Sequence, residues 1–251
     1  MADATEQTAV VLEAVGAITE RLEAEKEHLT DLDSAIGDAD HGANMARGFA
    51  AARDQTVDME DADPADVVKT VGTALISEVG GASGPLYGGS IMSASSELAG
   101  GLDEAATVAF AEAYLEKLQD RGDARVGDKT MVDALVPAVH TYRKSIEEDD
   151  LPPLTALSKA VDAAERGVEF TVPLRAKKGR ASYLGWRSVG HQDPGATSTL
   201  YILEELLDIA ADHLEGEIDT VEARELAERA LDAATRAEVE SLLDEASNRT
   251  G

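Results

Sequence analysis

Apolar residues recur every three to four positions along most of the sequence, and this spacing constrains the fold more than any other feature. The first such stretch, at about 6–28, places Val11, Val15, Ile18 and Leu22 on one helical face. The spacing returns in segments near 43–53, 64–79, 91–98, 103–120, 131–145, 154–168 and 200–214. No alternating strand pattern recurs. The sequence therefore predicts an all-α protein with about eight main helices, joined by three or four glycine-rich loops.

Local signals define some of the helix ends. Asp63-Pro64 predicts a helix start, with a capping residue followed by proline at the first helical position. Asp103 is expected to cap a later helix, and Pro137 to kink its helix or mark its first turn. We interpret residues 1–214 as the main domain. Residues 215–251, which contain no glycine-rich loop, are interpreted as a helical accessory extension with one or two short amphipathic helices.

An acidic stretch between the first two predicted helices is the strongest functional feature. Asp33, Asp38 and Asp40 lie in a short glycine-flanked loop that leads into a helix near Ala43. Hard cations such as Mg²⁺ take oxygen ligands, and helix N-termini attract phosphate. The loop therefore offers both halves of a metal–nucleotide site. Solvated surface acids are the alternative, and an EF-hand is excluded because its required Gly and Glu positions are not filled.

Two further loops have unusual compositions. The segment at 80–89 contains five glycines, which allow backbone to approach a ligand closely, although an ordinary turn is the alternative. The longest segment without helical periodicity is 171–195, where four of the 22 basic residues fall within 175–180. A basic cluster in so acidic a chain favours an anionic ligand. A mobile linker is the alternative, against which its Tyr, Trp, Leu and Val residues argue.

The charge of the chain excludes some classes of partner. Its 251 residues include 22 Lys+Arg and 50 Asp+Glu, for a formal net charge of −28. Nucleic-acid binding and anionic membrane surfaces are therefore not expected. There is no cysteine, no signal-peptide pattern and no apolar run of membrane-spanning length, so a cytoplasmic protein is expected. The acidity further suggests adaptation to a salt-rich cytoplasm, where counterions screen self-repulsion.

Five motifs in order resemble one family. They are Asp-Ala-Asp-His-Gly at 38–42, Gly-Gly-Ala-Ser-Gly-Pro-Leu-Tyr-Gly at 80–88, Gly-Asp-Lys-Thr-Met at 127–131, Lys-Gly-Arg-Ala-Ser-Tyr-Leu-Gly at 178–185 and Gly-His-Gln-Asp-Pro-Gly-Ala-Thr-Ser at 190–198. Together they resemble the nucleotide-binding L subunit of dihydroxyacetone kinase (the DhaL family) over roughly residues 6–214. The resemblance implies an eight-helix antiparallel up-and-down barrel with ADP or ATP and two Mg²⁺ ions at one end.

The resemblance also implies a role for individual residues. The Mg²⁺ ligands would be Asp33, Asp38 and Asp40. The nucleotide would be bordered by His41, Gly42, Ala43, Asn44, Ala82, Ser83, Gly122, Met131, Arg180, Asp193, Pro194 and Gly195. Arg180 would stabilise phosphate, and no side-chain nucleophile is expected, since phosphoryl transfer depends mainly on positioning and electrostatics.

The function implied by the resemblance is that of a phosphotransferase subunit. Bound ADP/ATP would relay a phosphoryl group from a phosphotransferase-system phosphoprotein, the M subunit, to dihydroxyacetone held on a partner K subunit. Alternatives are a kinase subunit with exchangeable ATP, a non-catalytic Mg-nucleotide regulatory module, and a relative serving another substrate. A homodimer is possible. Trp186 departs from the family pattern, and so does the extension after residue 214.

Overall fold

Aspartate caps and glycine breaks determine where the helices begin and end in this computed structural model, which describes residues 4–81 and 83–218. The Asp63 carboxylate accepts a hydrogen bond from Ala65 N, and the Asp103 carboxylate accepts one from Ala106 N. Both predicted helix starts are therefore correct. The main helices are α1 (Ala4–Ala24), α2 (Lys26–Ile36), α3 (His41–Thr56), α4 (Pro64–Glu78), α5 (Gly89–Ala94), α6 (Glu104–Gly122), α7 (Val132–Glu147), α8 (Pro153–Thr171) and α9 (Pro194–His213).

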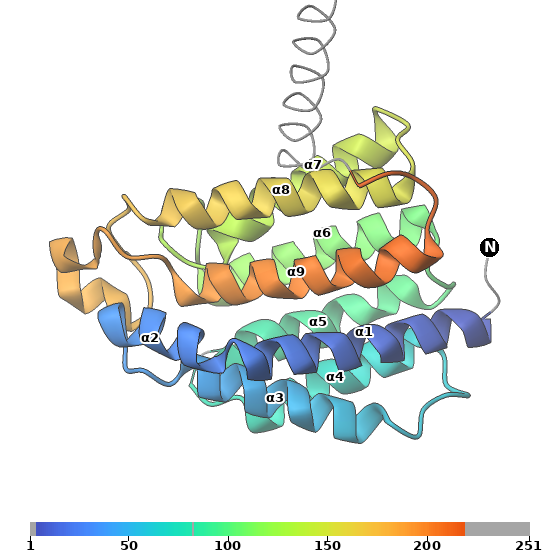
Figure 1. The fold of residues 1–251 in the computed structure, drawn as a ribbon, viewed down its shortest axis with the longest axis horizontal. Coiled ribbons are helices and arrows are strands. Elements are labelled where there is room, and N and C mark those ends of the chain that lie inside the picture. Colours follow the sequence, from blue (N-terminus) through green and yellow to red (C-terminus); the bar gives the residue numbers. More distant parts are fainter. Residues whose placement is uncertain (1–3, 82, 219–251) are drawn as a thin grey trace, which may run out of the picture. The chain divides into compact units, whose positions relative to one another are not determined.

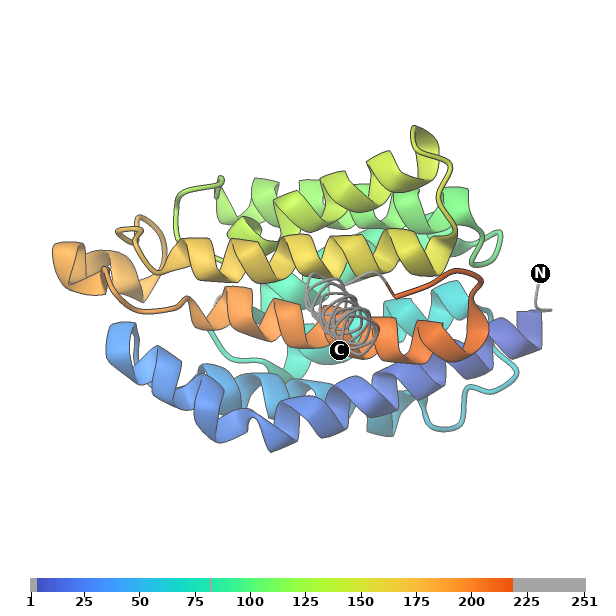
Figure 2. The same cartoon turned by 45° about the horizontal axis from the view of Figure 1, so that its top comes forward.

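The helices form a closed ring. Contacts run from α1 to α3 and then through α4, α5, α6, α7, α8 and α9 in turn, and α9 returns to α1 (Figure 1). Figure 2, turned by 45°, shows the same neighbours. Only Glu25 separates α1 from α2, so these two helices make one bent run and the described residues contain eight main helical segments. The predicted all-α, up-and-down barrel is confirmed. Residues 219–251, which carry most of the predicted helical extension, lie outside the described residues.

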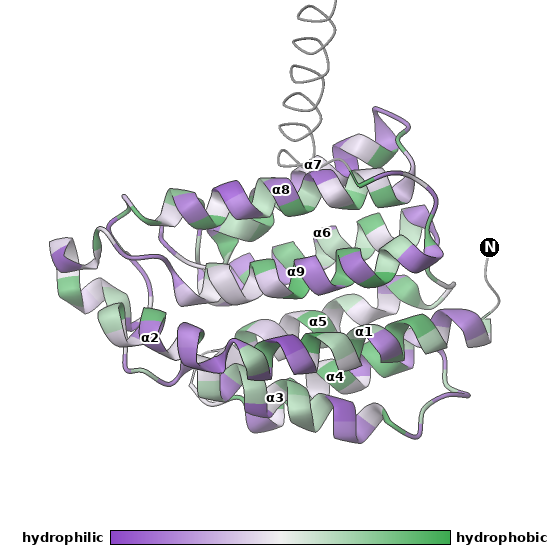
Figure 3. Cartoon of the chain, viewed as in Figure 1, coloured by the Kyte–Doolittle hydropathy of each residue, from purple (hydrophilic) through white to green (hydrophobic). Residues whose placement is uncertain are grey.

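The barrel interior is aliphatic and rich in alanine. One cluster of buried residues includes Leu22, Leu29, Met45 and Leu75, and a second joins α7, α8 and α9. Hydrophobic and hydrophilic residues both occur along each labelled helix, as expected when one face of a helix packs inward (Figure 3). None of the helices in the described part of the chain is long and apolar enough to cross a membrane.

Two parts of the sequence-based prediction were wrong in detail. Asp33 lies in the last turn of α2 and not in a loop, because Leu29 and Ile36 continue the buried face beyond residue 28. The glycine-rich segment is partly helical, since Gly84–Gly88 forms a π-helix, η1, which leads into α5 and then the 3₁₀-helix η2 (Ser95–Leu98). Its glycines allow close packing on α4: a Cβ on Gly88 would lie 2.5 Å from the carbonyl oxygen of Gly72.

Candidate functional site

Four connections meet at one end of the barrel and surround a pocket. They join α2 to α3, α4 to η1, α6 to α7, and α8 to α9, and the last contains the 3₁₀-helix η3 (Arg180–Ser188). In Figure 1 these connections lie at the same end as η3. The pocket has a volume of about 470 Å³ and is lined from all four. Its size is typical of small-molecule sites.

Three aspartates converge on one side of this pocket. One carboxylate oxygen from each of Asp33, Asp38 and Asp40 lies within 4.8 Å of the others. Asp33 is buried, and its Oδ2 accepts hydrogen bonds from Asp40 N (2.9 Å) and His41 N (3.2 Å). Ala39 takes the left-handed conformation (φ 61°) that reverses the chain between the other two aspartates.

Gly37 makes room for this cluster. A Cβ at residue 37 would lie 1.9 Å from Oδ1 of Asp33, so any side chain there would displace that carboxylate from its present position. The sequence presented Gly37 only as a flanking residue of an acidic loop. Its steric role depends on the position of Asp33 in α2, which the sequence-based prediction did not include.

Helix α3 begins beside the aspartates and points its N-terminus at the pocket. Gly42 lies so close to α2 that a Cβ would come within 2.1 Å of the carbonyl oxygen of Lys26. His41 is buried, and its Nε2 shares a hydrogen bond of 2.9 Å with Ser198 Oγ on α9. Burial lowers the pKa of His41, while Asp33 and Asp40 act in the opposite direction. The net lowering favours a neutral imidazole that links α3 to α9.

The facing wall is built on the start of α9 and on the loop between α6 and α7. Asp193 caps α9 by accepting a hydrogen bond from Ala196 N (2.8 Å), and burial raises the pKa of its carboxyl to about 7. Lys129 lies beside it, and its side chain is almost fully buried. Burial lowers the pKa of Lys129, while Asp193 and Asp133 act in the opposite direction. Sequence reasoning missed Lys129 as a site residue, although it lies within the quoted Gly-Asp-Lys-Thr-Met motif.

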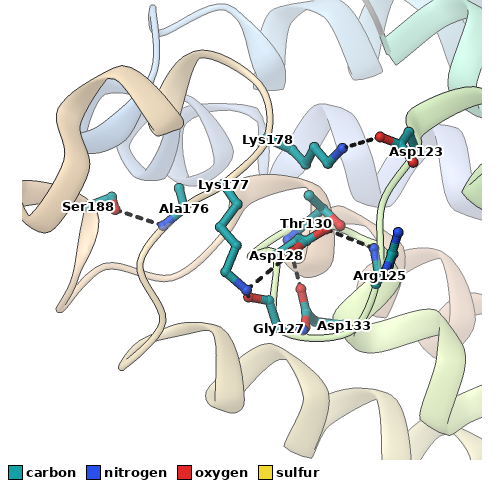
Figure 4. Close-up of polar contacts among 10 residues, drawn as sticks. All are labelled: Asp123, Arg125, Gly127, Asp128, Thr130, Asp133, Ala176, Lys177, Lys178 and Ser188. Carbon is teal, nitrogen blue, oxygen red and sulfur yellow. Dashed lines mark hydrogen bonds and ion pairs between the residues drawn. The ribbon is translucent and has the colours of Figure 1, made fainter.

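The segment 172–192, which we call the basic strap, closes the pocket from the third side. It contains five basic residues and no acidic one. Lys177 Nζ donates to Gly127 O (2.7 Å) and pairs with Asp128 (3.3 Å), and Lys178 Nζ pairs with Asp123 (2.8 Å; Figure 4). Arg180 pairs with Asp38 across the pocket. The strap is therefore bound to the α6–α7 loop through Lys177 and Lys178, and to the acidic cluster through Arg180.

Most of the residues proposed from the sequence line this one pocket. They are Asp33, Asp38, Asp40, His41, Ser83, Gly122, Met131, Arg180, Asp193, Pro194 and Gly195. Gly42, Ala43 and Asn44 are not among the lining residues and occupy the first turn of α3, where Asn44 Oδ1 accepts a hydrogen bond from Arg47 (2.7 Å). Ala82 lies outside the described residues.

The donor set fits a divalent metal ion. Three carboxylates whose oxygens lie within 4.8 Å of one another offer the hard, anionic ligands that Mg²⁺ prefers. Arg180 pairs with Asp38, so one carboxylate of the cluster has a cationic partner in this structure. The same arginine would lie within reach of phosphate oxygens bound to such an ion, and guanidinium groups bind phosphate well.

Comparison with known proteins identifies the family of the chain. The DAK2 domain family matches residues 35–208. The chain therefore belongs to the DAK2 domain family. Within that family it is similar to the ADP-binding subunit DhaL of the PEP-dependent dihydroxyacetone kinase of Escherichia coli (strain K12), with 43% identity over 193 residues, covering 72% of this chain and 87% of the relative. A DhaL subunit of Listeria innocua is 41% identical over 189 residues, covering 75% and 89%.

A solved structure shares the fold. The dihydroxyacetone kinase from C. freundii, crystallised in complex with AMP-PNP and Mg²⁺, superposes with a TM-score of 0.62 at 26% identity. The match covers 80% of this chain and 34% of the C. freundii chain. The present chain thus corresponds to about a third of that longer kinase.

Proposed function

We propose that this chain is the nucleotide-binding subunit of a dihydroxyacetone kinase. The observation that carries the proposal is the convergence of Asp33, Asp38 and Asp40, the N-terminus of α3 and Arg180 on one pocket of about 470 Å³. The DhaL relatives support it, since their names describe ADP-binding subunits of this kinase.

The three aspartates would hold Mg²⁺, two ions by the family resemblance, with phosphate oxygens completing the coordination. Bound Mg²⁺ would offset the negative charge of the phosphates. On the protein side, the positive end of the α3 helix dipole would favour phosphate nearby, with the His41 amide itself bonded to Asp33, and Arg180 would add charge-assisted hydrogen bonds. Leu86, Leu118 and Met131 offer an apolar wall for a nucleobase.

The phosphoryl group would pass through the nucleotide without a covalent side-chain intermediate. No Cys occurs in the chain, and His41 is buried and already hydrogen-bonded to Ser198. The pocket residues therefore serve to position and neutralise, which is most of what phosphoryl transfer requires. In this proposal the donor is a phosphotransferase-system phosphoprotein (the M subunit), the acceptor is dihydroxyacetone on a K subunit, and the location is the cytoplasm.

Metal-dependent nucleotide retention tests the proposal. Asp38→Ala and Asp40→Ala should each abolish Mg²⁺-dependent retention of ADP, measured as nucleotide released on denaturation, with the far-UV CD spectrum unchanged. Asp31→Ala removes the same charge from an exposed position on α2 outside the pocket and should bind ADP as wild type does. Equal nucleotide content in all four proteins would refute the metal assignment.

The form of the retained nucleotide distinguishes the phosphoryl donors. ADP that stays bound through purification supports transfer from a phosphoprotein. A site that exchanges ATP freely supports the alternative of an ATP-dependent kinase subunit. If no phosphoryl transfer occurs with a K subunit and either donor, the result would support the alternative that the chain is a regulatory Mg-nucleotide-binding module.

A further inference from the structure

The two ends of the basic strap are fastened to each other. Where the strap leaves α8, the Val172 carbonyl accepts a hydrogen bond from Gly190 N (2.8 Å). Where it enters α9, Asp193 N donates to Thr171 Oγ1 (3.0 Å). The segment between these bonds carries Arg180, and its exposed surface includes the only Trp of the sequence, Trp186, at 77% exposure.

Lys129 joins both of these ends from outside the strap. Its Nζ donates to the carbonyl oxygen of Thr171 (2.7 Å) and to that of His191. Thr171 is the last residue of α8, so its carbonyl belongs to the helix end whose acceptors lack partners within the helix and where positive charge is favoured. A lysine side chain can donate to the free carbonyl oxygens and also place positive charge at the helix end, because it is a cation with three hydrogen-bond donors.

The conformation of the α6–α7 loop directs the Lys129 side chain toward the strap ends. Lys129 has a left-handed backbone conformation (φ 63°), which is unusual for a residue with a side chain. The turn around it is held by Asp133, whose carboxylate accepts hydrogen bonds from Gly127 N (2.5 Å) and Thr130 N (2.9 Å; Figure 4). An uncommon backbone conformation persists where surrounding contacts impose it, and such positions cluster at functional sites.

We infer that Lys129 is a positioning residue, which fastens both ends of the basic strap so that Arg180 stands over the pocket. Lys129 also borders the pocket, so a direct contact with phosphate is the competing role. The inference depends on the proposed function only in naming Mg-ADP as the ligand. Whether Lys129 holds the strap in place can be measured without any ligand.

Limited trypsin digestion without nucleotide measures the closure. The strap offers five Lys and Arg sites, and cleavage there follows the population of the opened segment. Lys129→Met should raise strap cleavage by about tenfold or more and lower the fluorescence anisotropy of Trp186. Lys144→Met is the control. It removes a lysine from the last turn of α7, far from the strap, and should leave both the cleavage rate and the Trp186 anisotropy unchanged.

Affinity for Mg-ADP then separates positioning from direct contact. Lys129→Met should weaken Mg-ADP binding together with faster strap cleavage. Arg180→Met should also weaken binding, but with a much smaller rise in trypsin cleavage at the remaining sites, because it removes only the ion pair with Asp38 and leaves both strap ends fastened. Lys129→Gln, which keeps an amide donor, is used if the Met variant does not fold, and should show an intermediate cleavage rate.

Two results for Lys129→Met would overturn the inference. The first is weaker Mg-ADP binding with unchanged strap cleavage, which indicates direct contact with the ligand. The second is wild-type strap cleavage together with wild-type Trp186 anisotropy. Failure of the proposed function looks different. Wild-type protein that binds no Mg-ADP would reject that function, while the cleavage comparison would still decide the role of Lys129.

Discussion

At the scale of single residues, Gly37 determines whether the acidic cluster can form. Its Cα faces the Asp33 carboxylate, and a Cβ would approach Oδ1 to 1.9 Å. Asp33 in turn holds the amides of Asp40 and His41, so displacing its carboxylate disturbs the start of α3 as well as the metal ligands.

We therefore expect Gly37→Ala to weaken Mg²⁺-dependent ADP binding and to lower the free energy of unfolding by about 1–3 kcal/mol through steric overpacking. Calorimetric titration and urea unfolding measure the two effects. Gly16→Ala in α1 is the matched control, since nothing lies within 4 Å of its added Cβ. It should stabilise the helix by about 0.5–1 kcal/mol and leave ADP binding unchanged. Wild-type affinity in Gly37→Ala would contradict the steric role.

Asp193 gives a pH dependence whose sign can be stated. Burial raises the pKa of this carboxyl to about 7, above its ordinary value, so between roughly pH 4 and 7 the native state binds more protons than the unfolded state. The contribution of Asp193 to stability should therefore be present at low pH and be lost as pH rises through about 7.

Comparison with Asp193→Asn isolates this effect from the many other acids. Asparagine can still accept the capping hydrogen bond of Ala196 N but does not titrate. The unfolding free energy of wild type minus that of the variant, from urea melts between pH 5 and 8, should decline with pH. Parallel curves for the two proteins would show that Asp193 does not titrate in this range.

The single residues of the site were partly predictable from the sequence. The three aspartates, Arg180 and Asp193 belong to recognisable motifs, and the structure brings them to one pocket. Lys129 and Asp133 were not predicted, because their importance comes from burial and from hydrogen bonds to distant carbonyl and amide groups. A loop with balanced charge gives no sign in the sequence of which lysine will be buried.

At the scale of helices, predictability followed the strength of local signals. Helices α4 and α6 begin at the aspartates that the sequence identified, because a capping hydrogen bond depends only on residues within one turn. The π-helix at Gly84–Gly88 was missed because its stability comes from packing on α4, where Gly72 and Gly88 bring two backbones together. Tertiary contact there outweighed the low helix propensity of glycine.

The crossing of α7 and α8 links helix packing to the site. A Cβ on Gly167 of α8 would lie 2.2 Å from the carbonyl oxygen of Asp133, at the start of α7. The obstructing atom belongs to the backbone and cannot turn aside. The same Asp133 holds the loop that carries Lys129.

Gly167→Ala should therefore lower the free energy of unfolding by about 1–3 kcal/mol, by pushing α8 away from α7. Thermal and urea unfolding measure this loss. Gly100→Ala, where nothing lies within 4 Å of the added Cβ, should stay within about 0.5 kcal/mol of wild type. Equal stability of the two variants would show that the helices adjust without cost.

At the scale of the whole molecule, the net charge of −28 sets the response to salt. Close-spaced negative charges repel one another in the folded state, and added ions screen that repulsion. We expect the urea midpoint to rise as KCl increases from low to molar concentration. Choline chloride at equal ionic strength should act similarly if screening is the cause. A midpoint that does not rise with KCl would refute adaptation to a salt-rich environment.

Helices α1 and α9 pack against each other, and the beginning of α1 and the end of α9 lie at the end of the barrel opposite the connections that line the pocket (Figure 1). Sequence joined at either place would leave the pocket mouth open. The barrel can therefore occur either as one domain of a longer polypeptide or as a separate chain. The C. freundii kinase, of which such a barrel makes up about a third, is an instance of the first arrangement.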